Sequence, residues 1–362
     1  MFFQLVTQST KNKQNKTEEK QMSDEIHEID AQEGTFQAWH GKTIVRQEIP
    51  LNDCWLAKWD VEKRPLYRLK VAGENPLFEQ SEFKEITCTD NPNVVIGKPV
   101  ADSYGVISNA DFLKVVEQAM RDIPGSSVET VGSVCKRAKI FVSVKLKELE
   151  SYRAAGREFR PFLNFLSSHD GSTAFVVNTS NICTVCFNTF TANLFTKTEQ
   201  KSTVKHTKNA LEYLSNVPQL VESWFESNKV FATELDAMAR KRVSGAADFD
   251  AFFAGLLSVN SEREAEKFNP YAPLSTRKAN VVDRLTTLAF KGRGNAGENR
   301  ADAFSAVTDY YSHESAPNLN RQIESSDFGL GAQIKLRAFN ALRDDAAFAA
   351  YSRAGQKAIA FV

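Results

Sequence analysis

The chain has 362 residues, of which 45 are Lys or Arg and 45 are Asp or Glu, so its formal net charge is zero. A neutral chain has no overall field that attracts nucleic acid or membrane, so any site for a polyanion must be local. Hydrophobic residues make up 42% and charged residues 25%, which is typical of a globular protein with room for two subdomains. The apolar runs are too short to cross a membrane, and five cysteines without a secretory leader indicate a reducing compartment. We therefore expect a cytoplasmic protein.

The amino-terminal part of the chain predicts an arm, short strands and one helix. Residues 1–34 are mostly polar and predict a disordered arm. Short strands are expected at residues 43–45, 66–71 and 94–96. Apolar residues at helical spacing over 112–120 predict a helix, because Ser108 can cap its start and Pro124-Gly125 can stop it.

The centre of the chain predicts an antiparallel β-meander. In residues 139–147, aliphatic side chains alternate with Lys139, Phe141, Ser143, Lys145 and Lys147, so one face is aliphatic and the other is cationic around an aromatic ring. Strands at 159–166 and 173–178 follow, and residues 182–194 are predicted to form a helix that packs on the aliphatic face.

The carboxy-terminal part predicts helices. Apolar spacing of three and four residues recurs over 207–228, 229–242, 248–257, 280–290, 301–311 and 329–343. A flexible basic loop is expected at 291–300 and a polar loop at 312–326. The predicted fold class is α+β, with a disordered arm (1–34), a core domain of β-meander and packed helices (35–195) and a helical domain (196–362).

Cations interleaved with an aromatic ring predict a local nucleic-acid site. Cations can track a phosphate backbone while rings stack on bases, which is what a sequence-tolerant single-strand binder requires. An ordinary solvated sheet face and a charged helix would give the same pattern. The candidate residues are Lys136, Arg137, Lys139, Phe141, Lys145, Lys147, Arg153, Arg157, Lys201 and Lys205.

Three histidines lie in polar motifs and suggest an alternative, metal-dependent hydrolysis. If their loops converge, two carboxylates and three imidazoles would form a metal site. The candidate residues are His169, Asp170, His206, Asp309 and His313. The turn Ser168-His169-Asp170-Gly171-Ser172 also reads as a structural turn whose polar side chains satisfy its own backbone, and this interpretation is favoured.

Other chemical motifs are incomplete. Cys183-x-x-Cys186 is half of a zinc site, but no second cysteine pair follows, so we expect no metal and reduced thiols on a helix. Phosphate-binding loops are absent from the sequence, and Gly329-x-Gly331 before Lys335 favours a tightly packed helix start over a phosphate site. No cofactor is predicted.

The order of several motifs resembles a known family. These motifs include Asp102-Ser103-Tyr104-Gly105, Glu129-Thr130-Val131-Gly132-Ser133, the turn at 168–172, Val185-Cys186-Phe187-Asn188-Thr189 and Asp309-Tyr310. Together they resemble the phage- and plasmid-borne proteins that share domain of unknown function 932, over residues 35–345. The resemblance implies a mobile genetic element but no activity. Relatives usually carry arginine at the position of Cys183, so any anion contact there is in doubt.

The predicted order of elements, a helix, a basic meander and a second helix, looks like the core of ring-forming single-strand annealing proteins, which is an analogy of fold alone. We therefore expect a protein that binds or anneals single-stranded DNA in recombination or replication, acts as a homo-oligomer and does not enter a membrane. A metal-dependent hydrolase centred on His169 and Asp170, and a non-enzymatic protein that counters host defence, are the alternatives.

Overall fold

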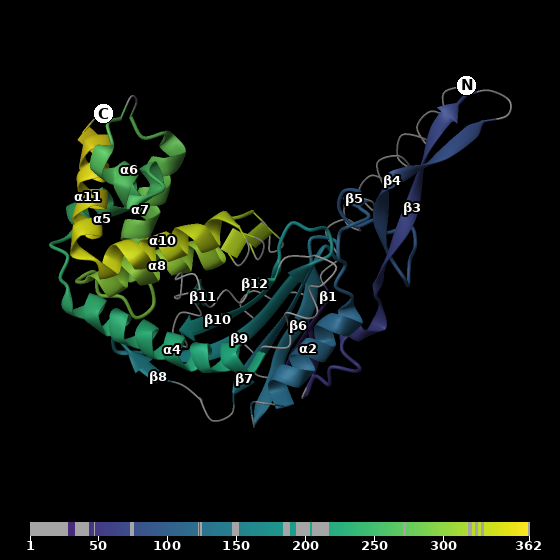
Figure 1. Ribbon diagram of the computed structural model, residues 1–362. Helices are drawn as coiled ribbons and strands as arrows, with labels where there is room; N and C mark the ends of the chain where they lie inside the picture. Colours follow the sequence, from purple (N-terminus) through teal and green to yellow (C-terminus); the bar gives the residue numbers. More distant parts are fainter. Residues whose placement is uncertain are drawn as a thin grey trace, which may run out of the picture.

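The computed structural model describes residues 28–32, 43–46, 48–72, 76–121, 123, 125–146, 152–183, 189–192, 203–204, 217–270, 273–317, 321–322, 325–326 and 329–360. Strands dominate the first half and helices the second, so the predicted α+β class is confirmed (Figure 1). Within these ranges, no helix is both long and apolar enough to span a membrane.

A large sheet forms the centre of the first half. Its strand order is β11-β10-β9-β7-β6-β1-β2, with β12 beside β10 and β8 beside β9. The strands are β1 (Glu28–Gln32), β2 (Thr43–Arg46), β6 (Ser126–Val134), β7 (Lys139–Leu146), β8 (Tyr152–Ala154), β9 (Arg157–Ser168), β10 (Phe175–Cys183), β11 (Thr189–Ala192) and β12 (Thr203–Val204). Strands β7, β9 and β10 are antiparallel neighbours, which confirms the predicted meander.

The two faces of this sheet differ as the alternation in β7 predicts. Ile140, Val142 and Val144 point into a buried cluster that includes apolar residues of helix α2 (Asn109–Arg121). Phe141 lies on the opposite face, where it packs with Leu166. Helix α2 begins where expected, because Ser108 Oγ accepts the N–H of Asp111 at 3.0 Å and donates to its carboxylate at 2.8 Å.

A second, smaller sheet projects from the first half (Figure 1). It contains β3 (Val61–Val71), β4 (Leu77–Cys88) and β5 (Val100–Ala101), and the 3₁₀ helix η2 (Trp55–Lys58) precedes it. The predicted strand at 66–71 is therefore part of a long hairpin. The predicted strand at 94–96 is wrong, because Val95 forms a single bridge with Thr87 instead.

Helices fill the second half, around a core rich in phenylalanine that includes Phe231, Phe252, Phe304 and Phe339. They are α4 (Val217–Arg240), α5 (Ala246–Ser258), α6 (Glu262–Lys267), α7 (Thr276–Lys291), α8 (Arg300–His313), α10 (Leu330–Arg343) and α11 (Asp345–Ala360). Helices α5 and α11 cross closely at Gly255 and Gly355, where a Cβ on either residue would collide with the backbone of the other helix.

Four sequence predictions are corrected. Residues 28–32 of the predicted arm form β1, which pairs with β6. Residues 182–194 are not a helix where described: Ile182 and Cys183 end β10, and residues 189–192 form β11, because both segments find antiparallel partners. The break expected near residue 228 does not occur in α4. Helices α6 and α11 were not predicted.

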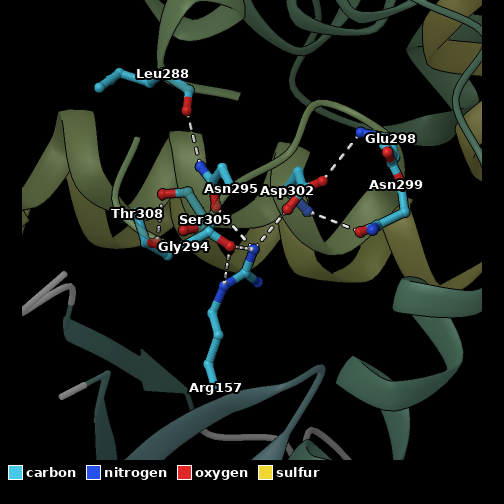
Figure 2. A network of polar contacts seen from close by, with 9 residues as sticks. All are labelled: Arg157, Leu288, Gly294, Asn295, Glu298, Asn299, Asp302, Ser305 and Thr308. Atoms are coloured by element: carbon cyan, nitrogen blue, oxygen red, sulfur yellow. Dashed lines mark hydrogen bonds and ion pairs between the residues drawn. The ribbon is translucent and has the colours of Figure 1, made fainter. Parts of the chain in front are cut away.

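One buried polar network joins the two halves (Figure 2). Arg157, at the start of β9, pairs with Asp302 of α8 at 2.5 Å, and their side chains are 7% and 3% exposed. The guanidinium also donates to the carbonyl of Gly294 at 2.9 Å and to Asn295 Oδ1 at 2.8 Å. The loop predicted to be flexible is thus anchored to the sheet through Gly294 and Asn295.

Replacing Arg157 by Ala should lower the free energy of unfolding by about 3–5 kcal/mol, because it leaves the Asp302 carboxylate buried without its cation. Arg153→Ala, at an exposed neighbour in β8, should change it by less than about 0.5 kcal/mol. Urea denaturation of the three proteins checks this. Equal losses in the two variants would contradict it.

Candidate functional site

The turn at residues 168–172 satisfies its own backbone. Ser168 Oγ donates to the carbonyl of Thr173 at 2.7 Å and accepts its N–H at 2.9 Å, and Asp170 Oδ1 accepts the N–H of Ser172 at 2.9 Å. Gly171 has φ +71°, in the left-handed region that glycine adopts without strain, and it lies against the ring of Tyr104. Burial and the charge of Asp170 raise the pKa of Tyr104 above its usual range. The geometry agrees with the structural interpretation of this turn.

His169 is fully buried beneath the turn. Its backbone N–H donates to the carbonyl of Ala138 at 2.8 Å, and its ring meets the edge of Trp59 at 5.7 Å between centroids. His169 Nε2 lies 3.0 Å from Asn109 Oδ1, while Asn109 Nδ2 donates to the carbonyl of Trp59 at 2.9 Å. Because the amide oxygen must accept, Nε2 carries the proton. A ring held in this way has no exposed edge for a substrate.

Asp60, which is distant in sequence, caps the N-terminus of α2. Asp60 Oδ1 accepts the backbone N–H of Val61 and of Asn109, each at 2.8 Å, and Oδ2 accepts that of Ala110 at 3.3 Å. The positive end of the helix dipole stabilises a carboxylate at this position. The N-terminus of α2 is therefore occupied by the protein itself.

A strained turn between β6 and β7 packs beside His169. Cys135, Lys136 and Arg137 have φ values of 56°, 55° and 66°, a run of left-handed residues that costs about 1–2 kcal/mol per residue. The Arg137 guanidinium donates to both carboxylate oxygens of Asp90, at 2.8 and 3.0 Å, and stacks 4.7 Å from the ring centre of Trp59. These contacts hold the turn in place.

A cleft of about 890 Å³ opens beside this cluster, between residues 49–60 and α2. Its apolar lining includes Leu51, Leu56, Leu113, Met120 and Val128. A mostly apolar hollow of this size with a few polar groups is the usual form of a ligand site. This cleft is the candidate functional site.

Three cations line the cleft: Lys58, Lys114 and Arg121. The side chains of Lys114 and Arg121 are 74% and 73% exposed, and each pairs with an acid on α2, at 3.5 Å to Asp111 and 3.0 Å to Glu117. Exposed ion pairs of this kind contribute little, at most about 1 kcal/mol. The cations can therefore exchange these partners for an anionic ligand at small cost.

A separate polar cluster lies on the face of the sheet opposite α2. Glu129 is the extra residue of a β-bulge in β6 and is 6% exposed. Burial raises the pKa of Glu129 to about 7, although the charges of Lys145 and Arg160 act in the opposite direction. Ser143 Oγ donates to Asn164 Oδ1 at 2.7 Å on the same face. Glu129 can change its protonation near neutral pH. Because its side chain is buried and out of reach of a substrate, this change affects the stability of the fold.

Among the residues that the structure describes, the predicted metal cluster does not form. His169 lies against the start of α2 and Asp170 follows it in the turn, whereas Asp309 and His313 lie on α8 in the helical half. No three described His, Cys, Asp or Glu side chains gather so as to hold a metal ion. Burial raises the pKa of Asp309 to about 6, and the charge of Glu314 adds to this effect. His206 lies outside the described residues.

Most described members of the predicted nucleic-acid surface have structural roles. Lys139 and Phe141 are buried within the sheet, Arg137 stacks on Trp59, and Arg157 pairs with Asp302. Lys136 and Arg153 are exposed and Lys145 is half-buried. Lys147, Lys201 and Lys205 lie outside the described residues. On β7, Lys139 and Phe141 are thus not exposed. A binding role for Lys136, Lys145 and Arg153 stays a prediction.

The cysteine and glycine motifs also find structural explanations where they are described. Cys183 ends β10, so it is not on the predicted helix, and Cys186 lies outside the described residues. Gly331 packs so closely that a Cβ would lie 2.8 Å from the carbonyl oxygen of Ser325, and its N–H donates to Ser325 Oγ at 3.2 Å. This agrees with a tightly packed helix start.

A family model described as a domain of unknown function (DUF932) matches residues 98–343. The match covers more than half of the 362 residues. The chain belongs to this family. Neither a curated protein nor a solved structure matches it significantly.

The DUF932 match includes only part of the cleft and of the elements around it. Helix α2 and the turns at 135–137 and 168–172 lie inside the matched range, whereas Trp59, Asp60 and the hairpin β3–β4 lie before it. The sequence patterns did not single out Trp59, Asp60 or Asn109. A usable signal was present, because two of the chain's four tryptophans, Trp55 and Trp59, stand one helical turn apart.

His169→Ala should lower the free energy of unfolding by about 2–4 kcal/mol, because it opens a cavity beside Trp59 and removes the hydrogen bond to Asn109. Ser172→Ala, at an exposed position of the same turn, should have little effect. Chemical denaturation measures both. A normally stable His169→Ala protein that has lost bound metal and turnover would favour the hydrolase interpretation instead.

Glu129 should make the protein less stable as pH rises. Its pKa is raised from 4.5 to about 7 in the folded chain, so between these values the folded state keeps a proton that the unfolded state releases. The free energy of unfolding should therefore fall by about 3 kcal/mol between pH 4.5 and 7 from this group. Glu129→Gln should lose this part of the pH dependence, and Glu117→Gln, at an exposed acid, should keep it. Identical pH profiles for wild type and Glu129→Gln would contradict the assignment.

Proposed function

We propose that the protein binds single-stranded nucleic acid and holds it in the cleft between residues 49–60 and α2. The observation that carries the proposal is the combination of an apolar floor with the exposed cations Lys58, Lys114 and Arg121 in one hollow.

The two parts of the cleft match the two parts of a nucleotide strand. Phosphates are attracted by lysine and arginine without regard to sequence. Unpaired bases can rest their flat faces on an apolar surface, which again favours no particular sequence. A duplex keeps its bases stacked inside, so the apolar floor favours a single strand.

Because the chain is neutral, binding of a polyanion requires a local cationic site. With equal numbers of cations and anions, the protein has no overall attraction for a polyanion. The cations predicted on β7 and β9 are largely engaged in folding, whereas those of the cleft are exposed and only weakly paired. This contrast supports the cleft over the sheet face as the place of binding.

The biological role that fits is handling of single strands during recombination or replication of a mobile element. The family resemblance implies a phage or plasmid origin, and strand annealing requires no nucleotide hydrolysis. The lack of a phosphate-binding loop in the sequence is compatible with that role.

Titration of fluorescently labelled single- and double-stranded oligonucleotides, followed by anisotropy, tests the proposal. The variant Lys58→Ala/Lys114→Ala/Arg121→Ala should bind the single strand more weakly, and the slope of log affinity against log salt should fall by about 2 units, at ~0.7 per phosphate contact. All three side chains are exposed, so the variant should fold normally.

A matched control removes three exposed cations that line a second hollow, by Arg263→Ala/Lys267→Ala/Lys278→Ala. It changes the net charge equally and should leave binding and its salt slope close to those of wild type. Equal losses in the two triple variants would reject the cleft as the site. Cleavage of the labelled strand on addition of Mg²⁺ would contradict a purely binding role.

A further inference from the structure

The hairpin β3–β4 has a supported base and an exposed outer part. At the base, Val61 and Ile86 are buried in the core shared with α2, and Lys63 Nζ donates to the carbonyls of Asp102 and Tyr104, each at 3.0 Å. Residues 67–72 are all exposed, and the outer part extends away from the rest of the molecule (Figure 1). A two-stranded ribbon alone is at best marginally stable in water.

The outer part carries five of the ten large exposed hydrophobic side chains that the structure describes. Leu69 pairs with Phe78 across the ribbon, and Tyr67 lies two residues away on the same face as Leu69. Val71 pairs with Leu77, but Leu77 directly precedes Phe78 in β4, so this second pair lies on the opposite face of the ribbon. Tyr67, Leu69 and Phe78, which we call the ribbon patch, are 60%, 53% and 63% exposed. Contiguous exposed apolar surface of this kind marks an interaction site.

The charges of the ribbon are balanced internally. Residues 61–88 contain five Lys or Arg and five Glu. Arg68 and Lys70 both approach Glu79, at 3.1 and 3.9 Å, and Arg64 pairs with Glu62 at 2.6 Å. A ribbon without net charge has no electrostatic preference for nucleic acid or for an anionic membrane. Two identical ribbons, in contrast, can approach each other without repulsion.

We propose that the ribbon patch is the surface through which two copies of this chain associate, patch against patch about a twofold axis. Such an axis brings the same surface of both copies together, so an apolar patch becomes its own complement. This inference is independent of the proposed binding of nucleic acid, because the ribbon patch shares no residue with the lining of the cleft.

The exposed area is that of a weak contact. Three half-exposed large side chains offer on the order of 400 Å² per copy, or about 800 Å² for two copies, which is in the range of weak, transient contacts. A contact of this size predicts a dimer that dissociates on dilution.

Sedimentation velocity of the full chain over a range of concentrations, without nucleic acid, tests the proposal. Wild type should shift from the 40.4 kDa monomer to a dimer as concentration rises. Leu69→Glu/Phe78→Glu, which puts repelling charges on the ribbon patch, should weaken dimerisation at least about tenfold. Because both side chains are exposed, its thermal unfolding should match that of wild type.

Arg68→Gln/Lys70→Gln, on the same ribbon, is the matched control and should still form a dimer. In a second measurement, Leu69→Cys should give a disulfide-linked dimer under mild oxidation, whereas Arg153→Cys, on an exposed surface of β8, should not. A wild-type protein that stays monomeric, or a Leu69→Glu/Phe78→Glu variant that dimerises normally, overturns the proposal. Protection of the ribbon from hydrogen exchange by an oligonucleotide alone, without dimerisation, would assign it to nucleic acid and also overturn it.

Discussion

The buried ion pair of Arg157 and Asp302 joins the sheet to the helices. Strand β9 lies between β7 and β10, and α8 packs against α4, α7 and α10, so the pair connects the middle of one half to the middle of the other. The nearby contact of Phe159 with Phe231 buries apolar surface, but it does little to fix the relative orientation of the two halves because the hydrophobic effect is not directional. Because the guanidinium must also reach Gly294 and Asn295, the pair selects a particular orientation of the two halves.

The same reasoning explains why two cations of the predicted surface, Arg137 and Arg157, have structural partners. A basic pattern in sequence gives the positions of charges but not the partners that folding brings to them. Arg137 meets an aspartate 47 residues away, and Arg157 meets one 145 residues away. A neutral chain has as many anions as cations, so a cation near the core is often neutralised by such a partner.

Much of the fold could be predicted because its local signals agree with its long-range contacts. The alternation of aliphatic and other side chains in β7 and the capping of α2 by Ser108 are both present in the structure. The helix predicted at residues 182–194 was wrong because strand pairing decides the conformation there. Helical spacing carries no information about a partner strand. At the site, the polar turn at 168–172 was recognisable as structural. The contacts of His169 with Asn109 and Trp59 were not, because they join segments 60 and 110 residues apart.

The place of β1 in the sheet has a consequence for how the protein folds. Asp30 pairs with Val131, about a hundred residues later, while β6, β7, β9 and β10 pair with near neighbours. Contacts that close long loops form slowly, so the meander should assemble while one edge of β6 is still unpaired. An open edge strand is a template for association with other chains. Pairing with β1 covers that edge of β6 and leaves only the four-residue β2 at this side of the sheet, which gives another chain little to pair with.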